Sequence, residues 1–152
     1  MSKKKAIILY LHVHQPYRVR HYTIFDVATS QDYFEAGYDE KTNNERIIHK
    51  VAEKSYIPTN RKLLELLQKY PDFKLSLSIT GTVLEQLQQW APKVLESFQD
   101  LVRTGQVEIV GETFHHSLAF FYSQAEFQIQ VEMHRQKVEE LFGVTPTAFR
   151  NT

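Results

Sequence analysis

Two histidines, a glutamine and a proline directly follow a short apolar run near the start of the chain. The run covers residues 6–11, and the polar segment is His12-Val13-His14-Gln15-Pro16. If the run is a buried strand, the segment lies at the carboxyl end of that strand, where folds of alternating strands and helices build their active sites. Histidine and amide side chains there can form hydrogen bonds with a polyhydroxylated substrate, and imidazole can also bind a metal ion.

The spacing of the two histidines favours a shared role. Residues two apart on a strand point to the same side, so His12 and His14 are predicted on one face of the sheet. Pro16 ends the strand, and Gln15 adds an amide group at its rim. An arbitrary His-x-His pair is more often one structural histidine and one exposed histidine. The Gln-Pro pair that follows favours a binding or catalytic site instead.

A second polar cluster covers residues 111–117 and contains Glu112, His115 and His116. It also follows a short apolar segment, so it is predicted at the carboxyl end of another strand. A buried glutamate beside histidines is unfavourable unless it is paired, which favours a working site over packing. The alternative is a solvated loop.

A third polar group lies at the last predicted strand, in residues 149–152. It contains Arg150 and Asn151. Near a sheet end these side chains would position a substrate, or Arg150 would neutralise Glu112. The residue types leave both interpretations open.

Strands and helices must bring these clusters together. Strands are predicted over residues 6–13, 74–80, 107–110 and 147–151. The second alternates, with Leu75, Leu77 and Ile79 on one side and Ser76, Ser78 and Thr80 on the other. Helices are predicted over about residues 44–54, 60–70 and 124–142, with two more beginning near Thr82 and at Pro92.

The helix ends have clear signals. Capping boxes are predicted at Thr82 and Ser123, and left-handed helix ends at Gly105 and Gly143. The apolar side of the last helix is predicted to hold Phe127, Val131, Val138 and Leu141. His134 falls on that side and is interpreted as a packing residue, whereas His21 and His49 are expected at the surface.

Alternating strands and helices predict an α/β fold with parallel strands and helical crossovers. The sheet either stays open or forms the first strands of a larger barrel. Residues 17–43 interrupt this pattern with scattered tyrosines and phenylalanines. Such a segment is either a packed excursion or part of a binding surface, and we expect packing.

Composition excludes several classes of function. The chain has 152 residues, with 18 basic and 18 acidic side chains, so no charged field attracts nucleic acid or an anionic membrane. It has no cysteine and therefore no disulfide or thiolate site. Its apolar runs are too short for a signal peptide or a membrane span. We expect a soluble, cytoplasmic protein with a neutral partner.

Three blocks of this sequence, in order, resemble glycoside hydrolase family 57 and within it the α-amylase-like members. Residues 11–20 resemble the first family signature, His-Gln-Pro after the first strand. Residues 107–118 resemble the second, and residues 149–152 resemble the start of the third. The resemblance implies the amino-terminal portion, about four β/α units, of an incomplete (β/α)7 barrel, with residues 1–152 as a single partial domain.

The resemblance also implies retaining cleavage of α-glucans such as starch, glycogen or maltodextrins, without a metal or another cofactor. Carried over by position, His14 and Gln15 would line the sugar site and His116 would contact the same ring. His12 and Glu112 are further candidates for substrate binding. In the family a glutamate is the nucleophile and an aspartate the acid and base, about 5 Å apart as retention requires.

Neither catalytic carboxylate is expected within the 152 residues, because the nucleophile would be the next residue. We therefore expect an inactive fragment, with its fourth strand left as an unpaired edge. Two other functions stay open. One is a metal-dependent hydrolase or deacetylase with His12, His14 and His116 as ligands, although no convincing aspartate ligand follows the first strand. The other is a non-catalytic glucan-binding module.

Overall fold

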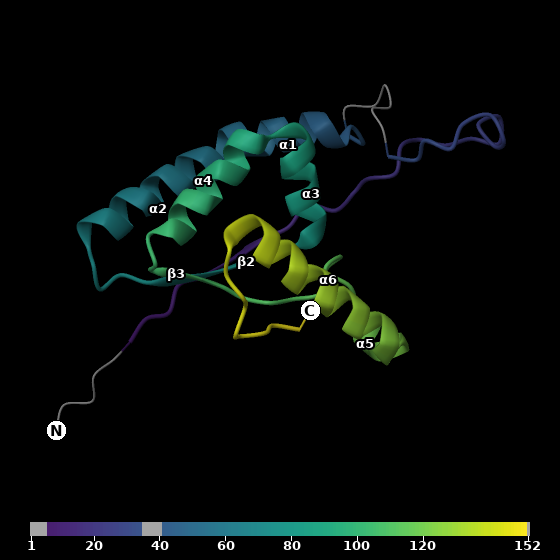
Figure 1. The fold of residues 1–152 in the computed structure, drawn as a ribbon. Coiled ribbons are helices and arrows are strands. Elements are labelled where there is room, and N and C mark those ends of the chain that lie inside the picture. Colours follow the sequence, from purple (N-terminus) through teal and green to yellow (C-terminus); the bar gives the residue numbers. More distant parts are fainter. Residues whose placement is uncertain (1–5, 35–40, 152) are drawn as a thin grey trace.

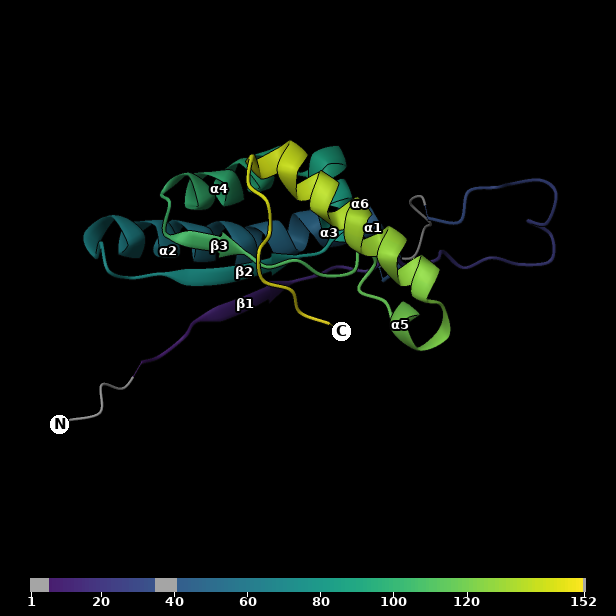
Figure 2. The same cartoon turned by 60° about the horizontal axis from the view of Figure 1, so that its bottom comes forward.

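Three short parallel strands form the sheet of the computed structural model, which describes residues 6–34 and 41–151. They are β1 (Tyr10–Val13), β2 (Leu75–Ile79) and β3 (Val107–Ile109), and β2 lies between the other two (Figures 1 and 2). Leu77 is paired with Leu11 on one side and with Ile109 on the other. The α/β prediction is confirmed, and each predicted strand is longer than the one observed.

The prediction of a fourth strand over residues 147–151 is wrong. This segment makes a single parallel bridge, between Phe149 and Gly111. Two hydrogen bonds hold it there: Gly111 N–H donates to the carbonyl of Ala148 (2.8 Å), and Arg150 N–H donates to the carbonyl of Gly111 (2.9 Å). The neighbouring chain has already left the sheet at Gly111, so no further residues remain for pairing.

The first crossover is one continuous helical run and not two separate helices. It consists of α1 (Asn44–Val51), a π-helical turn η1 (Ala52–Tyr56) and α2 (Ile57–Lys69). Pro58 explains the wider turn. Proline has no N–H to donate, and its ring crowds the carbonyl four residues earlier, so the chain widens into a π-turn before continuing.

The remaining helices begin and end largely where the sequence indicates. They are α3 (Gly81–Trp90), α4 (Pro92–Arg103), the short α5 (Ala119–Tyr122) and α6 (Gln124–Phe142). Ser123 caps α6, and Gly105 and Gly143 have left-handed backbones, as predicted. The predicted cap at Thr82 is wrong, because the hydroxyl of Thr80 at the end of β2 accepts the N–H of Val83.

The helices α1 to α4 lie on one side of the sheet, as Figure 2 shows. The alternation predicted for β2 is confirmed there, since Leu75, Leu77 and Ile79 are buried against the helices with Phe98 and Leu101. In the described part of the chain no helix covers the opposite side of the sheet (Figure 2). That face carries alternate residues of the strands, which are Tyr10, His12, Ser76, Ser78 and Glu108.

The aromatic-rich segment after β1 extends away from this body (Figure 1). At its base Tyr17 packs against Phe34 and Trp90, as expected, with ring centroids 5.6 and 6.3 Å away. At its tip Ile24 and Phe25 are 77% and 86% exposed, so the packing prediction is wrong for the tip. Residues 35–40 lie outside the described part. None of the described helices is long and apolar enough to span a membrane.

Candidate functional site

The structure brings the first two polar clusters together at the carboxyl ends of the strands. His12 and His14 come from the end of β1, and His116 comes from the segment that follows β3. The ring centre of His116 lies 4.6 Å from that of His12 and 4.8 Å from that of His14. The rings of His12 and His14 are 6.1 Å apart, so His116 lies close to both. We call these three residues the histidine cluster.

Glu112 lies beside the cluster and is 2% exposed. Its Oε1 accepts the hydroxyl hydrogen of Ser78 and lies 3.8 Å from Nδ1 of His12, while its Oε2 lies 3.4 Å from Nδ1 of His116. Burial raises the pKa of the Glu112 carboxyl to about 7, although the Ser78 hydrogen bond and the charge of Arg150 act in the opposite direction. A carboxyl group of this kind changes its charge near neutral pH.

The three histidines are held in their neutral forms. Burial, together with smaller contributions from the nearby His116, Arg150 and His14, lowers the pKa of His12 to about 4. Burial also lowers the pKa of His14 and of His116. A neutral imidazole has one nitrogen that donates and one that accepts a hydrogen bond, which suits it to a sugar hydroxyl.

Two hydroxyl residues, one in β2 and one directly after it, belong to the site, and the sequence interpretation missed them. Ser78 Oγ lies 3.2 Å from Nδ1 of His12, and Thr80 Oγ1 lies 2.9 Å from Nδ1 of His14. The register places His12 directly opposite Ser78. The alternating pattern of residues 74–80 already predicts both hydroxyls on one face of the sheet. Which histidine lies beside which hydroxyl depends on the register between β1 and β2.

The segment that carries His116 has an unusual backbone. His116 has a φ of 54°, in the left-handed region that residues other than glycine rarely adopt. The hydrogen bonds that hold the segment include His116 N–H to the carbonyl of Thr113 (3.1 Å), Phe114 N–H to the carbonyl of Gln130 (3.2 Å), and Ser117 Oγ to Oε1 of Gln130 (2.7 Å). Strained residues that are held this firmly concentrate at functional sites.

Gln130 in α6 was also missed. Of the four residues predicted on the apolar side of that helix, Val138 is buried and the other three are half-buried. The residues that α6 buries are Gln130, His134 and Val138. The signal that would have found Gln130 is its position four residues before His134, which was already predicted on the apolar side of the helix. His134 donates from Nε2 to the carbonyl of Ile79 (2.9 Å), which confirms its packing role. His21 and His49 are exposed, as predicted.

Gln15 is occupied by other partners. Its Oε1 accepts a hydrogen bond from Nη2 of Arg18 (3.0 Å), and its carbonyl accepts one from Nε2 of Gln86 (2.7 Å). Gln86 is fully buried, and its Oε1 has no hydrogen-bond partner within the described residues. The structure therefore joins Gln15 to an arginine and to α3 and not to a histidine.

Arg150 lies near the site without pairing to Glu112. It donates from Nη1 to the hydroxyl of Tyr10 (3.4 Å), and its guanidinium lies 5.5 Å from the centre of that ring. Among the described residues it makes no ion pair with Glu112, so it acts on that carboxyl only through its charge. Asn151 is exposed.

Within the described residues, one group of side chains could offer ligand atoms to a metal ion. It consists of His12, Glu112 and His116. Their potential ligand atoms all lie within 4.8 Å of one another. Zinc bonds of 2.0–2.1 Å in a tetrahedral site place ligand atoms about 3.3 Å apart, so the three groups would have to move inwards to hold the ion. The hydroxyl of Ser78 also occupies Oε1 of Glu112.

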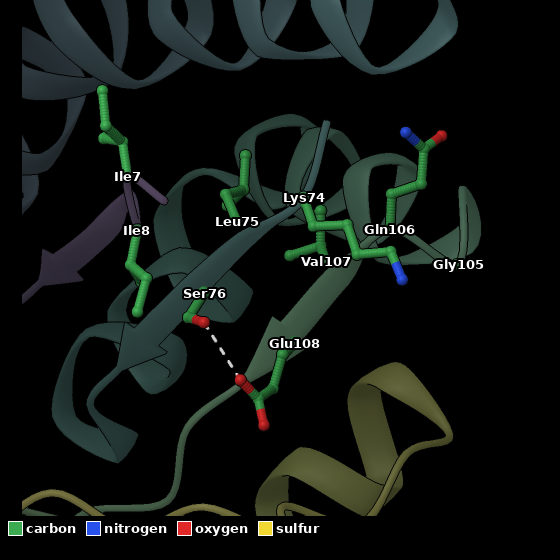
Figure 3. Close-up of a pocket in the computed structure, with 9 residues that line it drawn as sticks. All are labelled: Ile7, Ile8, Lys74, Leu75, Ser76, Gly105, Gln106, Val107 and Glu108. Carbon is green, nitrogen blue, oxygen red and sulfur yellow. Dashed lines mark hydrogen bonds between the residues drawn. The ribbon is translucent and has the colours of Figure 1, made fainter. Parts of the chain in front are cut away.

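A separate cleft of about 430 Å³ lies at the opposite, amino-terminal ends of the strands (Figure 3). Glu108 accepts a hydrogen bond there from Ser76 (3.0 Å), and Ile7 and Ile8 form part of the wall. The residues that line this cleft include no histidine. The histidine cluster therefore lies at the other end of the sheet from this cleft.

Comparison with known proteins gives consistent results. The model of glycosyl hydrolase family 57 matches residues 8–152. A protein named "Putative alpha-amylase" from Methanocaldococcus jannaschii is 42% identical over 141 residues, which are 92% of this chain and 29% of the relative. The chain therefore spans less than a third of that relative.

Two solved structures share the fold. The 4-α-glucanotransferase of Thermococcus litoralis matches with a TM-score of 0.60 and 21% identity, over 93% of this chain and 18% of its own. The family 57-type branching enzyme of Pyrococcus horikoshii matches with a TM-score of 0.63 and 16% identity, over 95% of this chain and 34% of its own.

Proposed function

The chain belongs to glycosyl hydrolase family 57, and on that premise we propose that it forms part of the substrate site of an enzyme acting on α-glucans. The observation that carries the proposal is the histidine cluster packed beside the buried Glu112 at the carboxyl ends of the strands. This is where barrels of parallel strands bind substrate. Starch, glycogen and maltodextrins are the substrates that family membership implies.

The residues of the site have different proposed roles. Neutral His14 and His116 form hydrogen bonds with sugar hydroxyls, and His12 extends this surface. Glu112 holds the cluster in place from behind, because it is almost fully buried. Gln15 would reach a sugar only by exchanging its hydrogen bond with Arg18 for one with the ligand.

We further propose that these residues bind substrate but do not cleave it. Retaining cleavage needs two carboxyl groups about 5 Å apart, and the carboxylate in contact with the histidine cluster among the described residues is Glu112. Both catalytic carboxyl groups would come from parts of the family domain not represented in these 152 residues. By itself the chain would then bind a glucan without turnover, as a binding module does.

Replacing His14 by alanine is expected to weaken maltotriose binding by about five- to tenfold. One hydrogen bond in a partly buried site contributes about 1–1.5 kcal/mol, and 1.4 kcal/mol corresponds to tenfold in affinity. Isothermal titration calorimetry of the 152-residue chain measures the change. His49→Ala is the matched control, since His49 is exposed on α1. Equal affinity of the parent and His14→Ala would show that His14 does not contact the sugar.

A metal-dependent hydrolase or deacetylase is the second candidate, and the closeness of His12, Glu112 and His116 is the observation in its favour. Our proposal predicts that EDTA leaves maltotriose binding unchanged, because the sugar is held by hydrogen bonds alone. The same calorimetric titration, repeated after dialysis against EDTA, measures this. Loss of binding that added Zn²⁺ restores would favour the metal-dependent enzyme.

A further inference from the structure

Two buried hydroxyl groups lie against the histidine cluster, one beside His12 and one beside His14. Ser78 and Thr80 are both fully buried, so water does not compete for their hydroxyl hydrogens. We propose that Ser78 and Thr80 are positioning residues that hold His12 and His14 in opposite tautomers. The site then offers one hydrogen-bond acceptor and one donor to neighbouring hydroxyls of a sugar. The choice of ligand rests on the proposed function, whereas the tautomers do not.

Ser78 fixes His12 through the carboxylate of Glu112. The single hydroxyl hydrogen of Ser78 is donated to Oε1 of Glu112. Towards Nδ1 of His12, 3.2 Å away, the same oxygen can then only accept. The neutral ring of His12 therefore carries its hydrogen on Nδ1. Oε1 of Glu112, 3.8 Å from that nitrogen, favours the same arrangement. Nε2 of His12 is left as an acceptor.

Thr80 fixes His14 in the opposite way, because it also caps a helix. Its Oγ1 accepts the N–H of Val83 in the first turn of α3 (3.3 Å). A backbone N–H can only donate. The hydroxyl hydrogen of Thr80 is therefore directed to the one acceptor that the described residues place beside it, Nδ1 of His14 at 2.9 Å. The neutral ring of His14 therefore carries its hydrogen on Nε2 and acts as a donor.

The opposite tautomers give the site a preference between ligand classes. Within the described residues, Nε2 of His12 and Nε2 of His14 have no hydrogen-bond partner. An acceptor beside a donor matches a pair of hydroxyls, each of which can donate and accept. A carboxylate has no hydrogen for the acceptor on His12, and an ammonium group has no lone pair for the donor on His14.

Nitrogen NMR of the 152-residue chain tests the tautomers without any sugar. In a neutral imidazole the protonated and unprotonated nitrogens have well-separated ¹⁵N chemical shifts, so a long-range ¹H–¹⁵N correlation spectrum identifies each tautomer. The spectrum is recorded at pH 9, above the pKa of about 7 that burial gives Glu112. We expect Nδ1–H for His12 and Nε2–H for His14. The same tautomer on both rings would overturn the proposal.

Two variants assign the effect to the hydroxyl groups. Ser78→Ala should shift His12 towards a mixture of tautomers and leave His14 unchanged. Its matched control is Ser76→Ala, because Ser76 lies two residues earlier and also donates to a carboxylate, Glu108 (Figure 3). An unchanged His12 in Ser78→Ala would contradict its role.

Thr80→Val should shift His14 towards a mixture of tautomers, and Thr80→Ser should keep the Nε2–H tautomer of the parent. Ser123→Ala removes the corresponding cap of α6 and controls for the loss of a cap alone. If these tautomers are found but maltotriose causes no saturable change, the positioning roles stand and the proposed function fails. If maltotriose binds while both rings share one tautomer, the proposed function stands and this inference fails.

Discussion

Glu112→Gln is expected to make the protein more stable than the parent at pH 8 by up to about 3 kcal/mol, and to change its stability little at pH 4. Burial raises the pKa of this carboxyl from 4.5 to about 7, and each pKa unit corresponds to about 1.4 kcal/mol. Between these two values the unfolded chain has lost the proton and the folded chain retains it. The contribution of Glu112 to stability therefore falls as the pH rises through this window and is level above it.

The glutamine variant isolates the effect of the charge, because glutamine has nearly the shape of glutamate and can make the same contacts with Ser78 and His116. Its amide oxygen can still accept the Ser78 hydrogen bond, and its amide group can donate to His116. The histidines act in the opposite direction. The folded pKa of His12 is lowered to about 4, so its contribution to stability rises with pH up to its unfolded value of 6.5. Only the difference between variant and parent at each pH therefore reports on Glu112.

Urea unfolding of variant and parent from pH 4 to pH 8 gives that difference directly. Glu108→Gln is the matched control, since Glu108 lies on the same face of the sheet, also accepts a serine hydroxyl, and is exposed. A difference that stays constant with pH in Glu112→Gln would show that Glu112 is not held with a raised pKa.

Gly81→Ala is expected to destabilise the protein by about 1–3 kcal/mol, the usual range for an overpacked core. A Cβ at position 81 would lie 2.2 Å from Cδ2 of Phe114, which is far inside contact distance. Phe114 is 3% exposed, and its backbone is held by Thr82 and Gln130, so the ring has little room to move. The higher helix propensity of alanine offsets part of this loss, at most about 1 kcal/mol.

The same substitution should also weaken maltotriose binding, because Phe114 lies midway between Glu112 and His116. Thermal and urea unfolding measure the stability, and calorimetry measures the affinity. Phe114→Leu in the Gly81→Ala background should recover part of both, since a smaller side chain makes room for the new methyl group. Full stability of Gly81→Ala alone would show that the close contact with Phe114 does not constrain the site.

Much of the fold was predictable because local patterns agree with the final structure. The alternation in β2 predicts which face packs on the helices, and both Ser123 and Gly143 lie at the predicted ends of α6. The polar segments after β1 and β3 were expected at one end of the sheet, which is why the histidine cluster could be anticipated. Parallel strands place such segments side by side.

The rest depends on tertiary structure. The register that sets His12 opposite Ser78 is not encoded by either strand alone. Thr80 and Thr82 are equally good caps by residue type, and only the end of β2 decides between them. Residues 147–151 have the composition of a strand, but Gly111 offers a single position for pairing. Pro58 was compatible with a break between two helices, whereas packing retains one run with a π-turn.

We propose that the histidine cluster at the carboxyl ends of the strands is the sugar-binding surface. The most direct test is a titration of the ¹⁵N-labelled, 152-residue chain with maltotriose, followed by both the histidine ring resonances and the backbone amide resonances. We predict saturable shifts for His12, His14 and His116, with little change at the exposed His21 and His49. Absence of saturable shifts at the cluster, or shifts confined to the cleft around Lys74 and Glu108, would contradict this account.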